Sequence, residues 1–182
     1  MERRTYLSIV GLATAGISAG CMSGGDGDGR ERDVKTLDLG DDAELGNVDV
    51  SVEAVKMFDA EDVKNLSPSS DDSKFVFVKV KIKQDGDGPG KMPYEGTEPG
   101  DLGLFYEGKH VTTVFEEDEV EADGTKYKAF GDSIQGAELS PNEDVERWMV
   151  YSVPSGYSKD DSYVQLKDLS ESSDTVYRWK LG

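Results

Sequence analysis

The sequence has very little cysteine, histidine and basic charge. Cys21 is the only cysteine, so no disulfide can form within the chain and the fold must be stabilised by its core. His110 is the only histidine, which excludes a metal site built on several imidazoles. The 20 Lys and Arg residues are outnumbered by 38 Asp and Glu residues, giving a formal net charge of −18. Because so acidic a chain repels phosphate backbones, we expect no nucleic acid partner.

The uncharged stretch from Thr5 to Gly20 is too short for a typical membrane-spanning helix. Such a helix needs about 20 mostly apolar residues, and here Ser, Thr and Gly dilute the Leu, Ile, Val and Ala. A short apolar stretch behind basic residues is typical of an export signal peptide. Arg3 and Arg4, followed by Thr-Tyr-Leu, resemble a twin-arginine signal, which is read as an address for export. We therefore expect residues 1–20 to be an export signal peptide, with Arg3 and Arg4 as its export signal.

Cys21 stands directly after this stretch, behind the small residues Ser18, Ala19 and Gly20. The arrangement resembles the lipobox of prokaryotic lipoproteins, which implies cleavage before Cys21 and attachment of lipid to its thiol. The alternative is a buried free thiol, since unpaired cysteine often packs as a small apolar residue. The position, the small neighbours and the polar stretch that follows favour lipid attachment. The implied location is the cell membrane, with the protein anchored through lipid and facing the outside.

The residues after Cys21 are rich in Gly and Asp and poor in apolar side chains. Such a composition buries too little apolar surface to offset the entropy of ordering, so we expect residues 21–45 to be the lipidated cysteine and a flexible acidic tether. Removal of residues 1–20 leaves 37 acidic against 18 basic residues, a net charge of −19. This balance resembles proteins of extreme halophiles, where molar salt shortens the screening length to roughly 3 Å.

Period-two alternation dominates the rest of the chain. Val76, Val78, Val80 and Ile82 fall on one face of the stretch Phe75–Lys83, and three lysines share the other face with Phe77, which predicts a strand with one buried side. Only Asp59–Leu66 has the pattern of a helical turn or two, with Asp59 as its N-cap. About seven to nine short strands separated by Gly, Pro, Asp and Ser predict an all-β fold, an antiparallel β-sandwich over residues 46–182. The other strands are expected at Val48–Glu53, Leu102–Tyr106, Lys109–Phe115, Tyr127–Phe130, Val145–Val153, Tyr163–Leu166 and Val176–Leu181.

The order of several of these segments resembles the immunoglobulin-like extracellular domains of prokaryotic surface lipoproteins. The segments that carry the resemblance are Phe75–Lys83, Leu104–Lys109, Leu139–Glu143, Trp148–Pro154 and Val176–Leu181. Members of that family are mostly accessory or binding modules without a shared catalytic site. The resemblance implies an immunoglobulin-like sandwich whose partner is an envelope protein or a glycan.

Clusters of acidic residues raise the question of calcium. Asp-Gly-Asp-Gly occurs at 26–29 and 85–88, and a run of acids spans 116–119. A calcium loop of the EF-hand kind needs oxygen ligands at its positions 1, 3 and 5 and Glu at 12, whereas counting from Asp85 places Pro89 and Gly96 there. Asp-Gly is itself a hairpin-turn signal. We expect no metal, no cofactor and a solvated acidic face.

His110 decides between two classes of function. A Ser-His-acid triad would have to use His110, but the chain has no Gly-x-Ser-x-Gly elbow to supply the serine. We therefore expect a non-enzymatic binding or structural module, with a small secreted hydrolase built on His110 as the alternative. Burial of His110 among strand side chains would count against the hydrolase. A Ser hydroxyl beside His110 would favour the hydrolase. For the aromatic residues near strand ends, packing is favoured over a ligand platform; these are Tyr94, Tyr106, Phe115, Tyr127, Tyr157 and Tyr163.

Overall fold

The computed structural model describes residues 32–182, except 71, 86, 99–100, 115–117, 132 and 169–173. The predictions for Arg3, Arg4, Cys21 and the signal peptide lie outside these residues. The described part forms one compact unit. None of its helices is long and apolar enough to cross a membrane.

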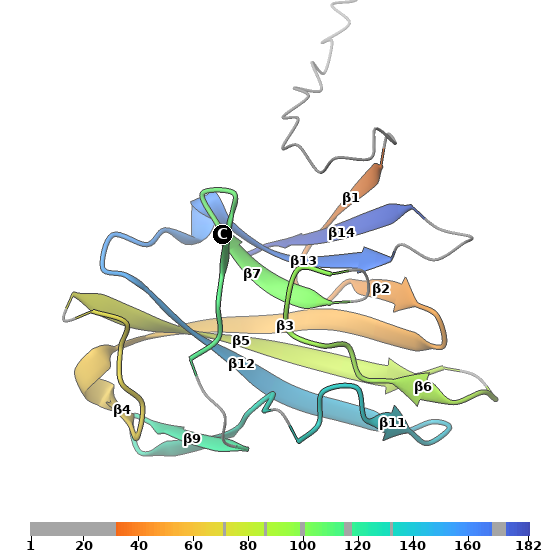
Figure 1. Ribbon diagram of the computed structural model, residues 1–182, viewed down its shortest axis with the longest axis horizontal. Coiled ribbons are helices and arrows are strands. Elements are labelled where there is room, and N and C mark those ends of the chain that lie inside the picture. Colours follow the sequence, from red (N-terminus) through yellow and green to blue (C-terminus); the bar gives the residue numbers. More distant parts are fainter. Residues whose placement is uncertain are drawn as a thin grey trace, which may run out of the picture. The chain divides into compact units, whose positions relative to one another are not determined.

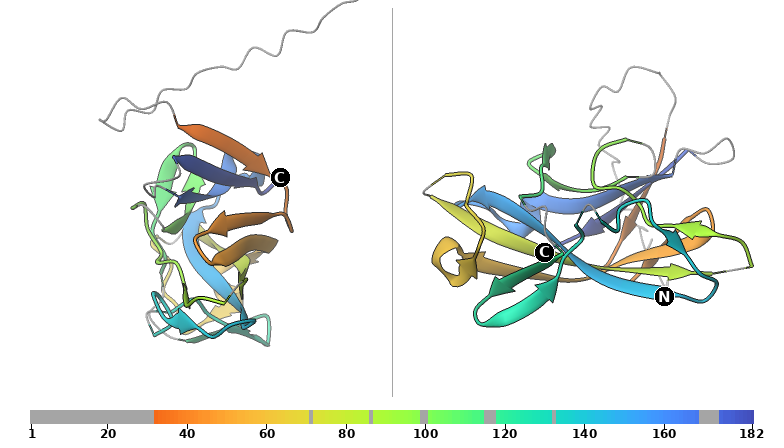
Figure 2. Two further views of the ribbon diagram at one scale, coloured as in Figure 1. Left: turned by 90° about the vertical axis from the view of Figure 1, so that its right-hand side faces the viewer. Right: turned by 60° about the horizontal axis from the view of Figure 1, so that its bottom comes forward.

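Two main β-sheets pack face to face (Figures 1 and 2). The five-stranded sheet has the order β1-β14-β13-β7-β8, with β1 at Asp33–Leu37, β14 at Thr175–Lys180, β13 at Ser162–Asp168, β7 at Leu102–Tyr106 and β8 at Lys109–Val111. The four-stranded sheet has the order β12-β5-β3-β2, with β12 at Asp144–Pro154, β5 at Ser73–Gln84, β3 at Val48–Asp59 and β2 at Asp42–Leu45. The predicted all-β sandwich is confirmed.

Two small sheets complete the domain. One has the order β10-β9-β4, with β10 at Thr125–Lys128, β9 at Glu119–Ala122 and β4 at Val63–Lys64. The other pairs β11, Glu138–Leu139, with β6, Gly90–Lys91. The described residues thus hold fourteen strands, more than the seven to nine expected, because several strands of two to four residues carry too little alternation to be predicted.

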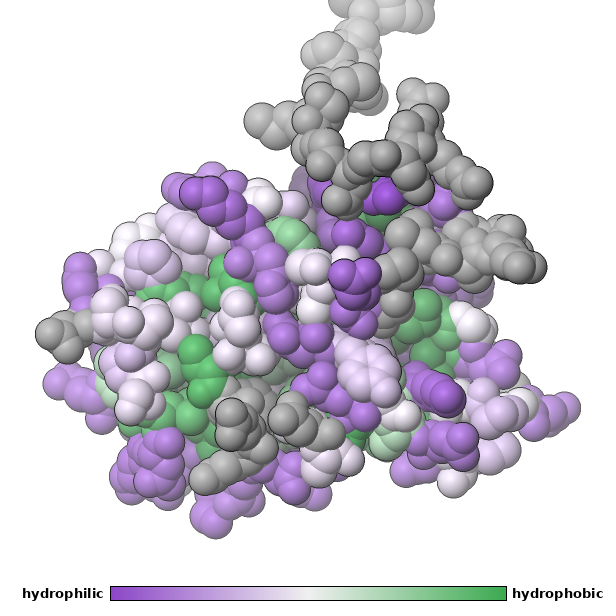
Figure 3. Space-filling model, viewed as in Figure 1, coloured by the Kyte–Doolittle hydropathy of each residue, from purple (hydrophilic) through white to green (hydrophobic). Residues whose placement is uncertain are grey.

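The middle strand β5 shows how the layers are built. Its Val76 and Val78 share a face with Tyr151 of β12, whose phenol reaches the backbone of Leu104 in the five-stranded sheet. Phe77 points to the opposite face and meets Tyr127 of β10 at 5.2 Å between ring centroids. The prediction of a single buried side is therefore wrong for the first half of β5, because the small β10-β9-β4 sheet covers the face that was expected to be solvated. In the view of Figure 3, hydrophilic residues stand out along the edges and hydrophobic residues lie between them.

The sandwich begins earlier in the chain than expected. β1 and β2 lie within residues 33–45, which the sequence analysis assigned to the tether. β1 pairs in parallel with β14, from Asp33 beside Thr175 to Leu37 beside Trp179, and every other pair between the strands is antiparallel. The boundary predicted at residue 46 is thus too late. The reason is that β1, with four of its five residues exposed, is ordered by its partner rather than by an apolar face of its own.

Turn chemistry explains two hairpins and corrects one expectation. Glu107-Gly108 and Asp123-Gly124 take positive φ values of 49° and 75°, and of 48° and 70°, which suits the tight turns between β7 and β8 and between β9 and β10. The Asp-Gly segment 85–88 is no hairpin turn, because it leads from β5 to β6, and β6 pairs with β11. The predicted helical turn is a short 3₁₀ turn at Ala60–Asp62, and the side chain of Asp59 makes no capping hydrogen bond.

Candidate functional site

His110 lies on β8, at one edge of the five-stranded sheet. Its Nε2 atom is 3.1 Å from Oε1 of Glu95, and the two side chains are only 21% and 12% exposed. The ring also meets Phe105 of β7 edge to face, at 5.5 Å between centroids. The chain thus brings its single histidine against a carboxylate that stands fifteen positions earlier in the sequence.

The segment that carries Glu95 is held on the sheet by backbone contacts. Leu102 N donates to Tyr94 O at 2.8 Å, and Gly96 N donates to Leu102 O at 3.2 Å. Gly103 makes room for this approach, since a Cβ atom there would stand 2.5 Å from Gly96 O and 2.9 Å from the His110 ring. Gly103 therefore permits the Glu95–His110 contact, because any larger side chain would push the segment or the ring away.

The electrostatics of the pair are set mainly by burial. Loss of water raises the pKa of the Glu95 carboxyl above its usual value, while His110 and hydrogen bonds from Thr113 oppose that rise. Beneath the pair, burial also raises the pKa of the Tyr151 phenol well above its ordinary value. Thr113 contacts Glu95 through both its side chain and its backbone. Among the described residues no serine hydroxyl is hydrogen-bonded to His110, so the site supplies an acid and an imidazole without an attacking serine.

Replacing Glu95 with glutamine is expected to flatten one part of the pH dependence of stability. Because burial raises the folded-state pKa of Glu95, its contribution to stability is fully present below the unfolded value of about 4.5 and is lost as the pH rises through the folded value. The free energy of unfolding of Glu95→Gln minus that of the wild type should therefore increase across this range. Urea unfolding at constant salt between pH 4 and 8 measures it.

The exposed carboxyl of Glu98 provides the matched control, because Glu98→Gln removes a charge from the same segment without touching His110. The carboxyl groups that the wild type, Glu95→Gln and Glu98→Gln share contribute equally to all three curves. Their titration therefore cancels when the free energies of unfolding are subtracted. Parallel stability curves for the wild type and Glu95→Gln would contradict the proposed effect of burial on Glu95.

A row of stacked side chains continues across the outer face of the five-stranded sheet. Phe105 stacks on Tyr163 with an interplanar angle of 3° and 5.3 Å between centroids, and the Arg178 guanidinium lies 4.7 Å from the centre of the Tyr163 ring. Cross-strand contacts of this kind stabilise a sheet. The preference for packing is confirmed for Tyr127 and Tyr157, which are buried in the core. Tyr94 is 56% exposed, and Phe115 lies outside the described residues.

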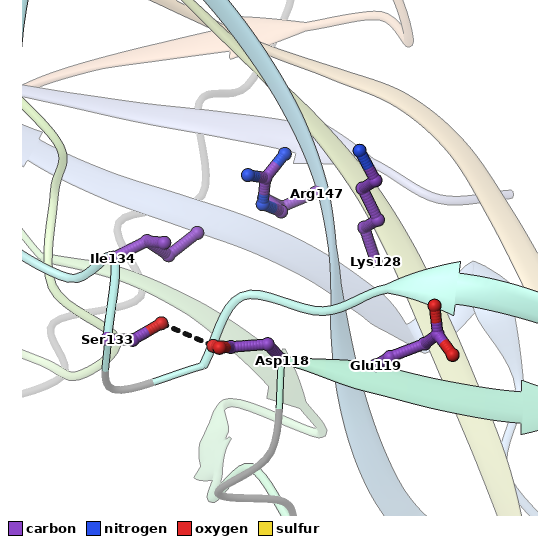
Figure 4. Close-up of a pocket in the computed structure, with 6 residues that line it drawn as sticks. All are labelled: Asp118, Glu119, Lys128, Ser133, Ile134 and Arg147. Carbon is purple, nitrogen blue, oxygen red and sulfur yellow. Dashed lines mark hydrogen bonds between the residues drawn. The ribbon is translucent and has the colours of Figure 1, made fainter.

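A second site lies where a loop crosses the edge of β12. A pocket of about 290 Å³ is lined by Asp118, Glu119, Lys128, Ser133, Ile134 and Arg147 (Figure 4). Ala129 forms a parallel bridge with Trp148, so the residues before them, Lys128 and Arg147, lie side by side. Phe130 N donates to Trp148 O at 2.9 Å and secures this arrangement. The local backbone thereby brings two cations to the rim of one pocket.

The charges in this pocket are unevenly paired. Asp118 accepts a hydrogen bond from the Ser133 hydroxyl, and Glu119 forms an ion pair with Lys126 at 2.6 Å. Arg147 donates from Nη1 to the backbone carbonyl of its neighbour Glu146 at 2.8 Å. Within the part of the chain that the structure describes, neither Lys128 nor Arg147 forms an ion pair with a carboxylate. Glu119 is thus paired with a lysine outside the pocket and Asp118 with a serine inside it, while the two cations have no carboxylate partner among the described residues.

β9 begins at Glu119, the last residue of the acidic run that was expected to form a solvated face. Glu119 pairs with Lys126 and Glu121 with Lys64, the latter at 2.5 Å, so these carboxylates hold lysines of neighbouring strands. The Lys64 contact lowers the pKa of Glu121. In the described ranges, no three His, Cys, Asp or Glu side chains gather where they could hold a metal ion.

The sequence identifies His110 as a candidate but shows neither Glu95 beside it nor the separate pair of Lys128 and Arg147. Glu95 belongs to an irregular segment without periodicity, and the Lys128–Arg147 pair depends on a single bridge between distant parts of the chain. The alternation in the stretches that hold Lys128 and Arg147 predicts strands but not which strands lie together. No local signal in the sequence reveals either site.

No protein-family model matches the sequence, and no curated protein matches it either. The fold is similar to that of the yjhA protein from Bacillus subtilis, with a TM-score of 0.53 and 16% identity over 80% of this chain and 99% of that chain. It is also similar to a putative lipoprotein, ycdA, from Bacillus subtilis, with a TM-score of 0.45 and 13% identity over 77% of this chain and 38% of that one. An uncharacterized beta-sandwich protein from Clostridium difficile is similar with a TM-score of 0.43 and 12% identity, over 84% of this chain and 99% of that chain. At such low identity, the likeness to yjhA shows a shared β-sandwich fold.

Proposed function

We propose that the chain is a non-enzymatic binding or structural accessory module of a halophilic prokaryote, exported by a twin-arginine signal and anchored on the outer face of the cell membrane by lipid on Cys21. The observation that carries this proposal is the placement of the only cysteine behind Ser-Ala-Gly, ahead of a β-sandwich with no other cysteine. Neither main sheet depends on a covalent link, because an extensive core of buried apolar residues joins them.

The start of β1 supports a short link between anchor and domain. Eleven residues separate Cys21 from Asp33, since positions 22–32 lie between them. A fully extended chain of that length spans at most about 40 Å. A domain held through Cys21 therefore stays close to the lipid surface, where its partners would be an envelope protein or a glycan.

Replacing Cys21 with serine is expected to move the protein from the membrane fraction to the medium. The hydroxyl cannot replace the thiol that carries the lipid, and the acyl chain contributes about 0.8 kcal/mol per buried CH₂ group. Fractionation of cells followed by detection of the protein measures the change. Ser23→Ala, two positions further on, serves as the matched control and should leave the protein in the membrane fraction.

The double variant Arg3→Lys with Arg4→Lys tests the export route independently of the lipid anchor. If the paired arginines are the address, uncleaved precursor accumulates inside the cell. Normal export of this variant would refute the twin-arginine route while leaving the anchor intact. Unchanged membrane association of Cys21→Ser would refute the lipid anchor.

The hydrolase alternative rests on one observation, the contact between His110 and Glu95. In a catalytic triad a carboxylate orients the imidazole through Nδ1 and leaves Nε2 to act as the base, whereas Glu95 faces Nε2 of His110, so Nδ1 would have to act as the base. No serine hydroxyl is hydrogen-bonded to the pair among the described residues, and Gly103 packs closely against the ring. Ester-hydrolysis assays on the wild type and His110→Gln separate the two functions, because a loss of hydrolysis in the variant would favour the enzyme.

A further inference from the structure

We propose that the pocket lined by Asp118, Glu119, Lys128, Ser133, Ile134 and Arg147 binds an acidic monosaccharide, a sugar of the uronic acid kind, through its carboxylate. The inference rests on the proposed function, a surface binding module, and names its ligand class. It depends on the cation pair, on the carboxylates beside it and on the size of the pocket.

The cations of the pocket differ from the lysines that are matched with acids. Six of the lysines that the structure describes form ion pairs with carboxylates, such as Lys79 with Glu146 at 2.8 Å and Lys64 with Glu121 at 2.5 Å. Like charges on directly neighbouring strand positions are destabilising. In a chain with almost two acidic residues for each basic one, Lys128 and Arg147 line the same pocket, and neither forms an ion pair with a carboxylate that the structure describes. An anion from outside would relieve this repulsion.

A carboxylate suits the site better than a phosphate. The Arg147 guanidinium offers the paired N–H donors that match a carboxylate, and Lys128 adds a point charge. Asp118 and Glu119 line the same pocket, so two positive and two negative side chains leave its net charge at zero. A dianion would be repelled by these carboxylates, whereas a monoanion can contact the cations on one side of the pocket.

The remaining lining residues suit a hydroxylated ligand. In Figure 4 the cationic ends of Lys128 and Arg147 lie on one side, and the hydrogen-bonded Ser133 and Asp118 lie on the other. Oxygen atoms of Ser133 and Asp118 can accept hydrogen bonds from sugar hydroxyls, and Ile134 supplies an apolar wall for the C–H groups of a ring. A volume of about 290 Å³ lies at the lower end of small-molecule pockets, which suits a single sugar.

Titration of the purified full chain, in detergent and constant molar salt, with D-glucuronate tests the proposal. A ligand of this size is expected to bind with a Kd of about 1 mM, because small polar ligands gain only a modest free energy of binding per non-hydrogen atom. Lys128→Gln and Arg147→Gln should each weaken binding at least about tenfold, as expected when a hydrogen bond to a charged group is lost. Lys109→Gln is the matched control, because Lys109 is an exposed strand lysine outside the pocket.

Methyl glucoside and acetate distinguish the parts of the ligand. The proposal expects neither to bind as tightly as glucuronate, since one lacks the carboxylate and the other lacks the hydroxyls. Equal binding of either compound, unchanged affinity in both pocket variants, or no binding of glucuronate at 50-fold the expected Kd would overturn it. Circular dichroism spectra confirm that all variants are folded. The fractionation of Cys21→Ser is independent of this titration, so failure of the ligand assignment and failure of the anchored module are distinguishable.

Discussion

Replacing Trp179 with alanine is expected to destabilise the domain by about 3–5 kcal/mol. Trp179 lies on β14 and is fully buried, so its loss leaves a cavity between the two main sheets. Its indole N–H also donates to Asp41 O at 2.9 Å, in the connection between β1 and β2. Because domains of this size are stable by only about 5–15 kcal/mol, the change removes a large share of the total. The midpoint of urea unfolding in constant molar salt measures it.

Trp179→Phe separates packing from hydrogen bonding. Phenylalanine retains much of the buried ring but cannot donate to the Asp41 carbonyl, whose lost hydrogen bond contributes about 1 kcal/mol. We expect the phenylalanine variant to fall between the wild type and Trp179→Ala. A loss below about 1 kcal/mol for the alanine variant would show that the indole is not central to the core.

Dialysis from molar salt to about 0.05 M salt is expected to lower the melting temperature strongly, because the screening length grows from about 3 Å to more than 10 Å. Two effects oppose each other. Cross-strand ion pairs such as Lys81 with Asp144, at 3.6 Å, gain strength at low salt, but each exposed pair contributes only about 0–1 kcal/mol. After residue 20 the acidic residues outnumber the basic ones by 19, so the negative side chains repel one another across the whole domain. We expect the repulsion to outweigh the pairs.

Thermal unfolding followed by circular dichroism over a series of NaCl concentrations tests this expectation. Sucrose at matched osmolality is the control, since it strengthens apolar burial without screening charge. Stabilisation by NaCl well beyond that by sucrose would support salt adaptation. An unchanged melting temperature between low and molar salt would contradict it.

The strands that could be predicted are those whose own side chains alternate. Leu102–Tyr106 has the bounds of β7, and β12 extends only one residue beyond each end of the predicted Val145–Val153. β5 was also located within two residues at each end. Each of these strands places apolar residues in the core, so the burial pattern can be read from the chain itself.

The elements that could not be predicted are ordered by partners distant in the sequence. β1 is mostly exposed and forms because β14 offers an unpaired edge. β9 starts at the end of an acidic run whose charges suggest a solvated face, yet its Val120 and Ala122 are buried. The candidate sites could not be predicted for the same reason. Glu95 meets His110, and Lys128 meets Arg147, only through tertiary contacts.

The parallel pairing of β1 with β14 places the start of β1 and the end of β14 at opposite ends of the five-stranded sheet. The chain enters the five-stranded sheet at Asp33, beside Thr175, and leaves it after Lys180, at the opposite end of β14. Six strand residues cover about 20 Å. A reporter or capture domain joined after Gly182 would therefore stand at the far end of the sheet from residue 32. Such a fusion would leave the residues that lead into β1 about one strand length away.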